Sequence, residues 1–375
     1  MRIVFVLSFL PNPRMYKRIR ALKEDNDVAV VCIKRSNQDV FTKQDIPGVD
    51  HYIESKDMPP ASQLLRRMKA SRGVKSFIVG KLNDLQPDVI YTSGLDNLIA
   101  IYDYASRHKT HVVYEVADLR ESYLEDTNKT ILQRFVDAQI CRSERKKFGC
   151  VDLLVLTSMK FYDAHYNAFV PIDKVINIPN MPELAAFDKY CRKQERHPFV
   201  LGFIGGIRYM DQMYMMVDAA KEAGVQLVVA GASVDDHSDF IDYCKKQSHV
   251  KLLGKYDYAK DIAGLYGMTD AIYSVYDADN ANVRIALPNK LYESVYCGLP
   301  IIVAKNTYLS ELVSDWGVGV AVSHKDKTGL VAILRRLKNE DEYYNSFVNN
   351  CKKKKGEMNI GIYLNDLRNR IKSLE

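Results

Sequence analysis

The sequence lacks the features that mark secreted, membrane-spanning and metal-binding proteins. Its seven cysteines are odd in number and scattered without a C-x-x-C pair, which favours free thiols in a reducing compartment over disulfides or a zinc site. No apolar run approaches the roughly 18 residues of a membrane span. The eight histidines show no short ligand spacing. We therefore expect a cytoplasmic protein, either free or peripheral on the inner face of the cell membrane.

Several catalytic motifs are also missing. The chain has no G-x-S-x-G elbow and no Walker loop, which disfavours a serine hydrolase or a P-loop kinase. No G-x-G-x-x-G follows the first apolar run, Ile3–Phe9, so a dinucleotide oxidoreductase is disfavoured too. That run continues into a polar, helix-like segment, and it predicts a first strand instead of a signal peptide.

Length and patterning predict two α/β domains. A chain of 375 residues is too long for one ordinary core, and 47% hydrophobic with 27% charged residues is typical of globular proteins. Apolar strands alternate with helices, which predicts parallel sheets with helices on both faces, and the alternation restarts at Phe199. We predict two Rossmann-like domains facing across a cleft: residues 1–182, a linker 183–197, residues 198–355, and a C-terminal helix 356–375 that packs back on the first domain. The clearest predicted strands are Asp27–Ile33, Pro87–Tyr91, His111–Glu115, Leu153–Thr157, Phe199–Ile204, Gln226–Ala230 and Ala271–Val275.

The net charge of +6 is unevenly placed. Residues 61–81 contain six cations and no acidic residue, with apolar residues at roughly helical spacing among them. Such a helix can bind an anionic membrane, and it can equally be a core helix with a solvated basic face. No nucleic-acid motif accompanies the charge, so we expect no nucleic-acid partner. The cations are Arg66, Arg67, Lys69, Arg72, Lys75 and Lys81.

The most informative segment is the one that starts at Pro288. Proline suits a first helical turn, Gly298 suits a helix end, and the run Ile301–Val303 predicts a buried strand. The open amides of such a helix favour an anion, and Lys290 adds a positive charge. Glu293 lies three residues on, on the same face, so the pair is either a surface ion pair or a clamp for phosphate and hydroxyl groups.

A glycine turn provides a second candidate. Gly205 and Gly206 follow a predicted strand, and they either form a tight turn or let the backbone approach a ligand closely. Arg208 comes directly after them, where its rigid donor fork can pair with a diphosphate.

Taken together, the motifs resemble those of the GT-B glycosyltransferases, retaining family 4 type, over nearly the whole chain. The resemblance lies in their order and spacing. The motifs are Pro13–Ile19, Pro87–Tyr91, Val113–Leu119, Leu156–Ser158, Ile178–Asn180, Ile204–Arg208, Val228–Gly231 and the Pro-x-Lys-x-x-Glu of residues 288–293.

The resemblance implies roles for the second domain. Arg208 and Lys290 would grip the nucleotide diphosphate and stabilise the leaving group without metal, and Glu293 would bind the nucleotide ribose. Two departures affect the donor sugar. Ile285 stands where many relatives have a sugar-binding Glu, and residues 209–215 contain no Lys. We expect the loop Asp279–Arg284, with Asn282, to supply sugar contacts instead.

The acceptor side is less well defined by the motifs. Ala117 stands where relatives often have a catalytic His, and Asp118 follows it. Asp118 either steers the proton of the attacking hydroxyl or caps a helix. We assign Arg120 and Arg14 to the acceptor as well, although Arg14 can instead pair with an acidic neighbour. Asp277-Ala278-Asp279 imitates the metal motif of another glycosyltransferase fold, but it lies too late in the chain, so we predict neither metal nor cofactor.

The resulting hypothesis is a metal-independent, hexosyltransferase-type enzyme. It would transfer a sugar from a nucleotide diphosphate to a glycan or lipid-linked acceptor, with retention, in surface polysaccharide biosynthesis. The substitutions Ile285 and Ala117 suggest the alternative, a catalytically silent GT-B protein that acts as a partner or scaffold of another glycosyltransferase.

Overall fold

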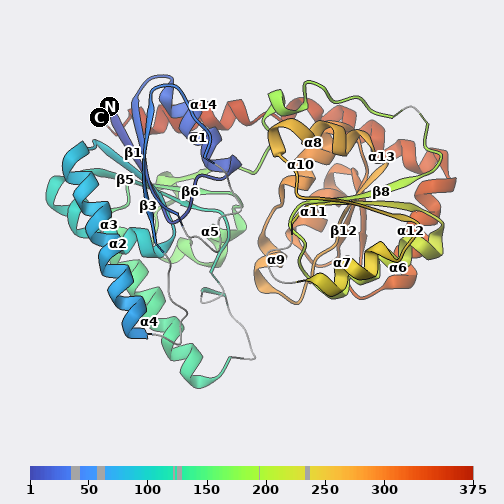
Figure 1. Cartoon of the computed structure of the whole chain (residues 1–375), viewed down its shortest axis with the longest axis horizontal. Helices are drawn as coiled ribbons and strands as arrows, with labels where there is room; N and C mark the ends of the chain where they lie inside the picture. Colours follow the sequence, from blue (N-terminus) through green and yellow to red (C-terminus); the bar gives the residue numbers. More distant parts are fainter. Residues whose placement is uncertain are drawn as a thin grey trace. The chain divides into compact units, whose positions relative to one another are not determined.

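The computed structural model of the chain describes residues 1–34, 43–56, 64–120, 123–124, 129–193, 195–232 and 237–374, without the side chains of residues 64–69. The chain forms two compact units (Figure 1). One comprises Met1–Ile178 with Gly361–Glu375, and the other comprises Pro179–Ile360. No helix among the described residues is both long and apolar enough to cross a membrane.

The first unit is built on a seven-stranded parallel sheet. Its strand order is β3-β2-β1-β4-β5-β6-β7, and β1 lies between β2 and β4, with Ile3 opposite Val28 on one side and Val89 on the other. Apolar residues fill the central strands because helices cover both faces of a parallel sheet. The strands are β1 (Arg2–Leu7), β2 (Asp27–Lys34), β3 (Val49–Ser55), β4 (Val89–Ser93), β5 (His111–Val116), β6 (Leu153–Leu156) and β7 (Val175–Asn177).

In the described part of this unit, five α-helices connect the strands, and the C-terminal helix joins them. Asn12 caps the first, accepting a hydrogen bond from the amide of Met15, and Pro13 takes the first helical position, where its missing N–H costs nothing. The helices are α1 (Pro13–Lys23), α2 (Leu64–Leu85), α3 (Leu95–His108), α4 (Ile131–Lys147), α5 (Lys160–Ala164) and α14 (Ile360–Lys372).

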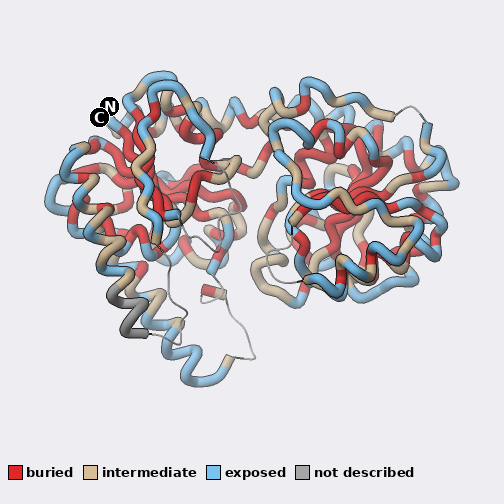
Figure 2. Tube along the Cα trace, in the orientation of Figure 1, coloured by how far each residue is buried: buried red, intermediate tan, exposed pale blue. Residues whose placement is uncertain are grey.

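The second unit contains a six-stranded parallel sheet of order β10-β9-β8-β11-β12-β13. The strands are short and buried at the centre, and the core lies between them and the helices (Figure 2). The strands are β8 (Val200–Ile204), β9 (Gln226–Ala230), β10 (Val250–Gly254), β11 (Ala271–Ser274), β12 (Ile301–Ala304) and β13 (Gly319–Val322). The helices are α6 (Met210–Ala223), α7 (Ser238–Lys245), α8 (Tyr258–Gly267), α9 (Ala281–Ile285), α10 (Asn289–Cys297), α11 (Tyr308–Trp316), α12 (Lys327–Asn339) and α13 (Asp341–Lys354).

Both sheets reverse their direction of growth beside their first strand. In the first unit the chain moves outward from β1 to β3 and then returns to β4; in the second it moves from β8 to β10 and returns to β11. The loops leaving the two strands at such a reversal part in opposite directions and leave a crevice at the carboxyl ends of the strands. The prediction of two Rossmann-like α/β units is confirmed, and the crevices lie after β1 and β4 and after β8 and β11.

The predicted linker is bound to the second unit. The hydroxyl of Tyr190 donates to the carbonyl of Cys297 at 2.6 Å, and the ammonium of Lys193 pairs with buried Asp270 at 2.7 Å. The second unit accordingly begins at Pro179 and ends at Ile360, and the chain then returns to the first unit in α14.

The C-terminal helix is fixed to the first unit by burial and by charge. Leu367 and Ile371 are fully buried, and Arg368 forms ion pairs with Glu24 and Asp25 just after α1. These contacts make residues at the end of the chain part of the first unit's core.

Leu367→Ala should therefore destabilise the first unit by about 2–5 kcal/mol, because it removes a fully buried side chain and leaves a cavity. Ile362→Ala is the matched control on the same helix, since Ile362 is exposed, and its effect should stay within about 0.5 kcal/mol. Urea unfolding of both variants measures the difference. Equal effects would show that α14 does not pack as described.

Candidate functional site

The crevice of the second unit is formed where two glycine turns approach each other. Gly205 follows β8 with φ +145°, and Gly231 follows β9 with φ +152°. Their backbones are so close that a Cβ added to Gly231 would lie 1.8 Å from the carbonyl oxygen of Gly205. Glycine is required at Gly231 for this approach as well as for its φ. The two glycine turns therefore lie against each other at the carboxyl edge of the sheet.

Helix α10 brings a cation to this turn. Pro288 is the N-cap of the helix, one position earlier than the predicted first turn, and Gly298 ends it with φ 70°. Among the described residues no side chain caps this N-terminus. The amide of Leu291 donates to the Pro288 carbonyl at 3.2 Å, and the two amides before it remain available to an anion. Lys290 is almost fully buried, and a Cβ added to Gly205 would lie 3.0 Å from its Nζ.

Tyr276, at the end of β11, holds the Lys290 ammonium in place. Lys290 Nζ donates to the Tyr276 hydroxyl at 2.6 Å and lies 4.3 Å from the centre of the Phe203 ring. Burial alone would raise the pKa of Tyr276, but Lys290 and, more weakly, Arg208 outweigh it, and the pKa lies below its usual value. A lysine buried this deeply, with no carboxylate partner among the described residues, provides a positive charge that an anionic ligand can neutralise.

Glu293 lies on the same helix with different partners. The hydroxyls of Tyr258 and Tyr266 donate to its two carboxylate oxygens at 2.6 and 2.7 Å. Burial, and then the carboxylate, raise the pKa of both phenols well above the usual value, so they remain donors at any physiological pH. Each carboxylate oxygen keeps a further lone pair for a ligand hydroxyl. Lys290 and Glu293 therefore do not form the surface ion pair that was the alternative.

Arg208 and Gly206 are exposed beside the buried Lys290. Arg208 is close enough to Tyr276 to lower its pKa, so the structure brings Gly205, Arg208 and Lys290 to one place. Tyr209 follows in the left-handed region with φ 57° as the N-cap of α6, and no side chain caps that helix. Its ring lies 5.5 Å from that of Tyr276.

The segment predicted as a sugar-binding loop is partly helical. Residues Ala281–Ile285 form α9, whose N-cap Asn280 accepts from the amides of Asn282 and Val283. The expectation of a loop is wrong here, because the Asn280 N-cap stabilises a helical turn. The helix is only five residues long, which is too short to show a helical pattern in the sequence. Asn282 is half-buried on this turn, and its contact with the donor sugar stays a prediction.

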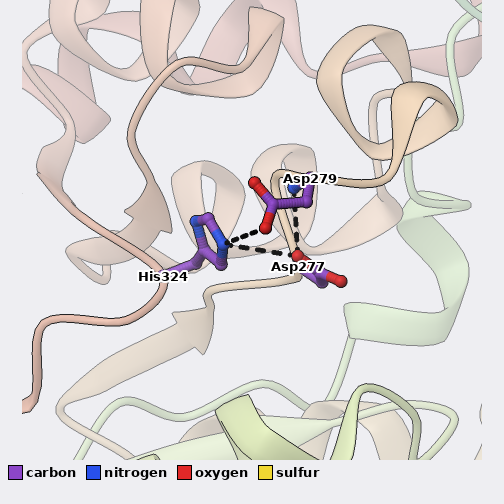
Figure 3. A group of neighbouring side chains, drawn as sticks. All are labelled: Asp277, Asp279 and His324. Carbon is purple, nitrogen blue, oxygen red and sulfur yellow. Dashed lines mark hydrogen bonds and ion pairs between the residues drawn. The ribbon is translucent and has the colours of Figure 1, made fainter. Parts of the chain in front are cut away.

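Three further side chains converge beside this crevice (Figure 3). Asp277 and Asp279 follow β11, and His324 follows β13; its Nε2 lies 3.3 Å from Asp277 and 3.6 Å from Asp279. Their candidate ligand atoms lie within 4.8 Å of one another. Lys325 forms an ion pair with Asp279 at 2.5 Å. Its ammonium group balances part of the negative charge of the two aspartates, which a metal ion would otherwise neutralise. The sequence analysis considered the two aspartates alone, because His324 is distant in the chain.

The first unit has a buried ionic cluster below the carboxyl ends of its strands. Glu115, on β5, is fully buried and pairs with Arg14 at 2.9 Å and Arg18 at 3.4 Å, and it accepts a hydrogen bond from Tyr91. Burial alone would raise the pKa of Glu115. The two guanidinium groups and Tyr91 lower this pKa by more than burial raises it, so the net shift is downward. Arg14 thus has the acidic neighbour that was the alternative to acceptor binding.

Asp118 and Arg120 follow the same strand and are exposed. Ala117, between them and β5, accepts a hydrogen bond from the Thr157 hydroxyl at 2.9 Å, which fixes the start of this segment. The acceptor role of Arg14, Asp118 and Arg120 stays a prediction.

The basic segment of residues 61–81 is described only in part. Residues 61–63 and the side chains of Arg66, Arg67 and Lys69 lie outside the described ones. Of the other cations, Lys75 pairs with Asp103 and Lys81 pairs with Asp84.

The sequence analysis missed the tyrosines around α10. Tyr276 comes two residues after β11 at the carboxyl edge of the sheet, and that position is the signal by which it could have been found. Tyr258 and Tyr266 lie on α8, eight residues apart, and nothing in their sequence context relates them to Glu293.

Comparison with known proteins agrees with this geometry. Residues 189–354 match the family described as "Glycosyl transferases group 1". The chain is 21% identical over 270 residues to the succinoglycan biosynthesis protein ExoL of Rhizobium meliloti (strain 1021); the match covers 67% of this chain and 64% of that protein, which is less than two thirds of its length.

Two solved structures share the fold over the whole chain. Sucrose-phosphate synthase (tll1590) from Thermosynechococcus elongatus has a TM-score of 0.77 and 13% identity, with 100% of this chain and 99% of that chain covered. Anabaena Alr3699/HepE, in complex with UDP, has a TM-score of 0.72 and 16% identity, with both chains fully covered.

The two parallel sheets and these structural neighbours together define the GT-B fold of two Rossmann-like units. The match of residues 189–354 is the more particular result: it places a resemblance to the glycosyl transferases group 1 family in the second unit, and the resemblance to the GT-B glycosyltransferases is confirmed. The retaining family 4 assignment stays a prediction.

Gly231→Ala should disrupt the crevice of the second unit. The added methyl group meets the Gly205 carbonyl, and alanine is strained at this φ, so we expect a loss of at least about 2 kcal/mol of stability. Gly264→Ala is the control. Gly264 is exposed on α8, and an added Cβ would have no atom within 4 Å, so the stability of this variant should rise by about 0.5–1 kcal/mol. Thermal unfolding distinguishes the two, and a neutral Gly231→Ala would contradict the close approach.

Glu115→Gln should give a pH-dependent loss of stability. Because the folded pKa of Glu115 lies below the unfolded value near 4.5, its contribution is present above that pH and is lost as pH falls through the folded pKa. Relative to wild type, the variant should lose about 3–5 kcal/mol at neutral pH, and the difference should shrink in acid. Urea unfolding between pH 7 and pH 3 measures it. Glu24→Gln, which removes an exposed partner of Arg368, should cost no more than about 1 kcal/mol, and a pH-independent difference for Glu115→Gln would contradict the assignment.

Proposed function

We propose that the protein transfers a sugar from a nucleotide diphosphate to a glycan or lipid-linked acceptor, with retention, as a hexosyltransferase-type enzyme. The observation that supports this best is the buried Lys290 ammonium, held by Tyr276 beside the Gly205 turn and the uncapped N-terminus of α10. A buried cation beside open helix amides suits a diphosphate, whose negative charge both groups stabilise.

Each donor group would bind a different part of the nucleotide sugar. Lys290 and the exposed Arg208 would hold the diphosphate and stabilise the charge that develops on it as the sugar leaves. Gly205 and Gly206 would let the phosphate approach the backbone. Glu293 would accept the ribose hydroxyls, since Tyr258 and Tyr266 hold its carboxylate in a fixed orientation. Asn282 would contact the donor sugar.

The acceptor side is proposed from the first unit. Asp118 would accept or steer the proton of the attacking hydroxyl, and Arg120 would orient the acceptor. Arg14 would contribute positive charge through its partly exposed guanidinium while Glu115 fixes its position. The relative ExoL is named for succinoglycan biosynthesis, and the proposal for this chain is likewise a surface polysaccharide.

We also propose that catalysis needs no metal, because Lys290 and Arg208 supply the charge that a metal would provide. Asp277, Asp279 and His324 offer the competing arrangement, and activity that a chelator abolishes and Mn²⁺ restores would favour it. We propose a cytoplasmic location, with peripheral contact between residues 61–81 and an anionic membrane.

Lys290→Ala should weaken binding of a nucleoside diphosphate by about 10- to 150-fold, the range expected for a hydrogen bond to a charged group. Titration calorimetry with UDP and GDP measures the affinity. Lys255→Ala is the matched control, because Lys255 is an exposed lysine directly after β10. Tyr276→Phe keeps the ammonium and should lose less affinity than Lys290→Ala. An unchanged affinity in folded Lys290→Ala would remove the proposed role.

The alternative is a catalytically silent partner of another glycosyltransferase, and the substitutions at Ile285 and Ala117 favour it. The two hypotheses differ in donor consumption. Wild-type protein, supplied with membranes and a panel of UDP- and GDP-sugars, should release the nucleoside diphosphate. Binding without any release across the panel would support the silent protein instead.

A further inference from the structure

Helix α4 carries an apolar surface that faces solvent. Of the nine large apolar side chains that are exposed in the described part of the chain, four lie within six consecutive residues of α4. Single exposed apolar residues are common, but a contiguous group marks an interaction surface. We call these four the α4 tip: Ile131 (89% exposed), Leu132 (72%), Phe135 (61%) and Val136 (48%).

The tip extends away from the sheet of its unit (Figure 1), and Figure 2 colours this end of the helix as exposed. Every residue from Ile131 to Val136 is exposed, whereas the other end of the helix is anchored. There Glu144 is fully buried and bonds His165 Nε2 at 2.8 Å, and the Tyr166 hydroxyl donates to it at 3.4 Å. The helix is therefore fixed at its base and presents its first turns to the surroundings.

The N-terminus of α4 is stabilised as a helix despite its exposure. Thr130 forms a capping box with Gln133, in which its hydroxyl accepts from the Gln133 amide at 3.2 Å. Such a cap contributes about 1 kcal/mol and prevents fraying of the first turn. The apolar side chains are thus held on a preformed helix.

The four apolar residues share one face with two cations. At 100° per residue they span an arc of about 140°, and Arg142 and Lys146 fall within the same arc. The apolar part is about 7.5 Å long, and the two cations lie about 9 and 15 Å beyond Val136. Both are exposed. A helix that enters a bilayer by its tip would place its apolar turns within the 5–10 Å boundary region and its cations at the headgroups.

The acidic residues of α4 do not oppose this arrangement. Asp137 pairs with Lys129 at 2.8 Å, and Glu144 is the buried anchor described above. The exposed face therefore presents apolar groups and positive charge together, which is complementary to an anionic lipid surface and not to a neutral one.

Helix α2, for which the charge pattern left a membrane contact and a core helix as alternatives, is different in the described part. Ile78 and Leu82 are buried in the core, and Lys75 and Lys81 are paired with acids. Ile78 and Leu82 are used for packing, so the described part of α2 can add charge at a membrane but cannot insert these two side chains.

We propose that the α4 tip inserts into an anionic bilayer, with Arg142 and Lys146 at the lipid phosphates. This insertion would anchor the first unit on the membrane. It requires no donor or acceptor, so it stands or falls separately from the proposed transfer reaction.

The first experiment measures binding of the full chain to vesicles of phosphatidylglycerol mixed with phosphatidylcholine, by flotation. Ile131→Ser, Leu132→Ser, Phe135→Ser and Val136→Ser combined should weaken binding at least tenfold, since four apolar side chains no longer leave water. The control is Ile172→Ser with Ile362→Ser, two exposed apolar residues elsewhere, which should bind as wild type does. Failure of wild type to bind, or equal binding of the tip variant, would overturn the proposal.

The second experiment tests the cations. Arg142→Gln with Lys146→Gln should weaken binding by about tenfold or more in low salt, because each cation near the surface contributes about 1 kcal/mol. Binding should also fall with added salt and on vesicles of phosphatidylcholine alone. Lys352→Gln with Lys353→Gln removes the same charge from exposed positions on α13 and should have little effect. Equal losses from both pairs would indicate attraction by net charge only and would contradict the geometry.

The third experiment separates lipid from a second copy of the chain as the occupant. Phe135→Trp in a Trp316→Phe background places the single tryptophan at the tip, and its emission should shift to the blue when vesicles are added. Ile362→Trp in the same background should not shift. Light scattering must show wild type and the tip variant as the same oligomer without lipid. A dimer that the serine variant dissociates, together with no fluorescence shift, would assign the tip to self-association and refute the proposal.

Discussion

The arrangement of both units follows from one constraint, the parallel pairing of all strands. A parallel strand must be reached by a crossover, so every strand of a sheet ends at the same edge. Where the order of growth reverses, between β1 and β4 and between β8 and β11, the departing loops leave room for a ligand. Gly205 and Tyr276 follow β8 and β11, and this is why groups from distant parts of the chain meet there.

The chemistry of the second unit depends on how its charges are buried. In the described part of the chain, the partners of Lys290 are a phenol and two aromatic faces, which leaves its charge available. Glu293, one turn along, has its carboxylate fixed by two tyrosines. The first unit uses the opposite solution, because the charge of Glu115 is matched by Arg14 and Arg18 within the core. The unbalanced cation is the group that suits an anionic ligand, and the balanced cluster is the one that fixes structure.

Several elements could be predicted because their physics is local. The buried central strands, the glycine end of α10 and the motif order predicted the fold class and the position of Lys290. The edge strand β3 (Val49–Ser55) was missed, because one side of an edge strand faces solvent and its residues are half polar. Helix α9 was expected as a loop for a similar reason, since five residues are too few to show a helical period. The basic pattern of residues 61–81 left a membrane contact and a core helix as alternatives, and it could not say that Ile78 is needed in the core.

By itself, the sequence determined the class of fold, the two-unit organisation and the residue types that suit a diphosphate, because periodicity and glycine turns are properties of short segments. Only the tertiary structure decided the partners: Tyr276 for Lys290, Tyr258 and Tyr266 for Glu293, and His324 for the two aspartates after β11. Only it showed that the apolar residues at the start of α4 face solvent while those of α2 are buried. The reason is physical: burial and charge pairing depend on which segments meet in space, and separation along the chain does not record that distance.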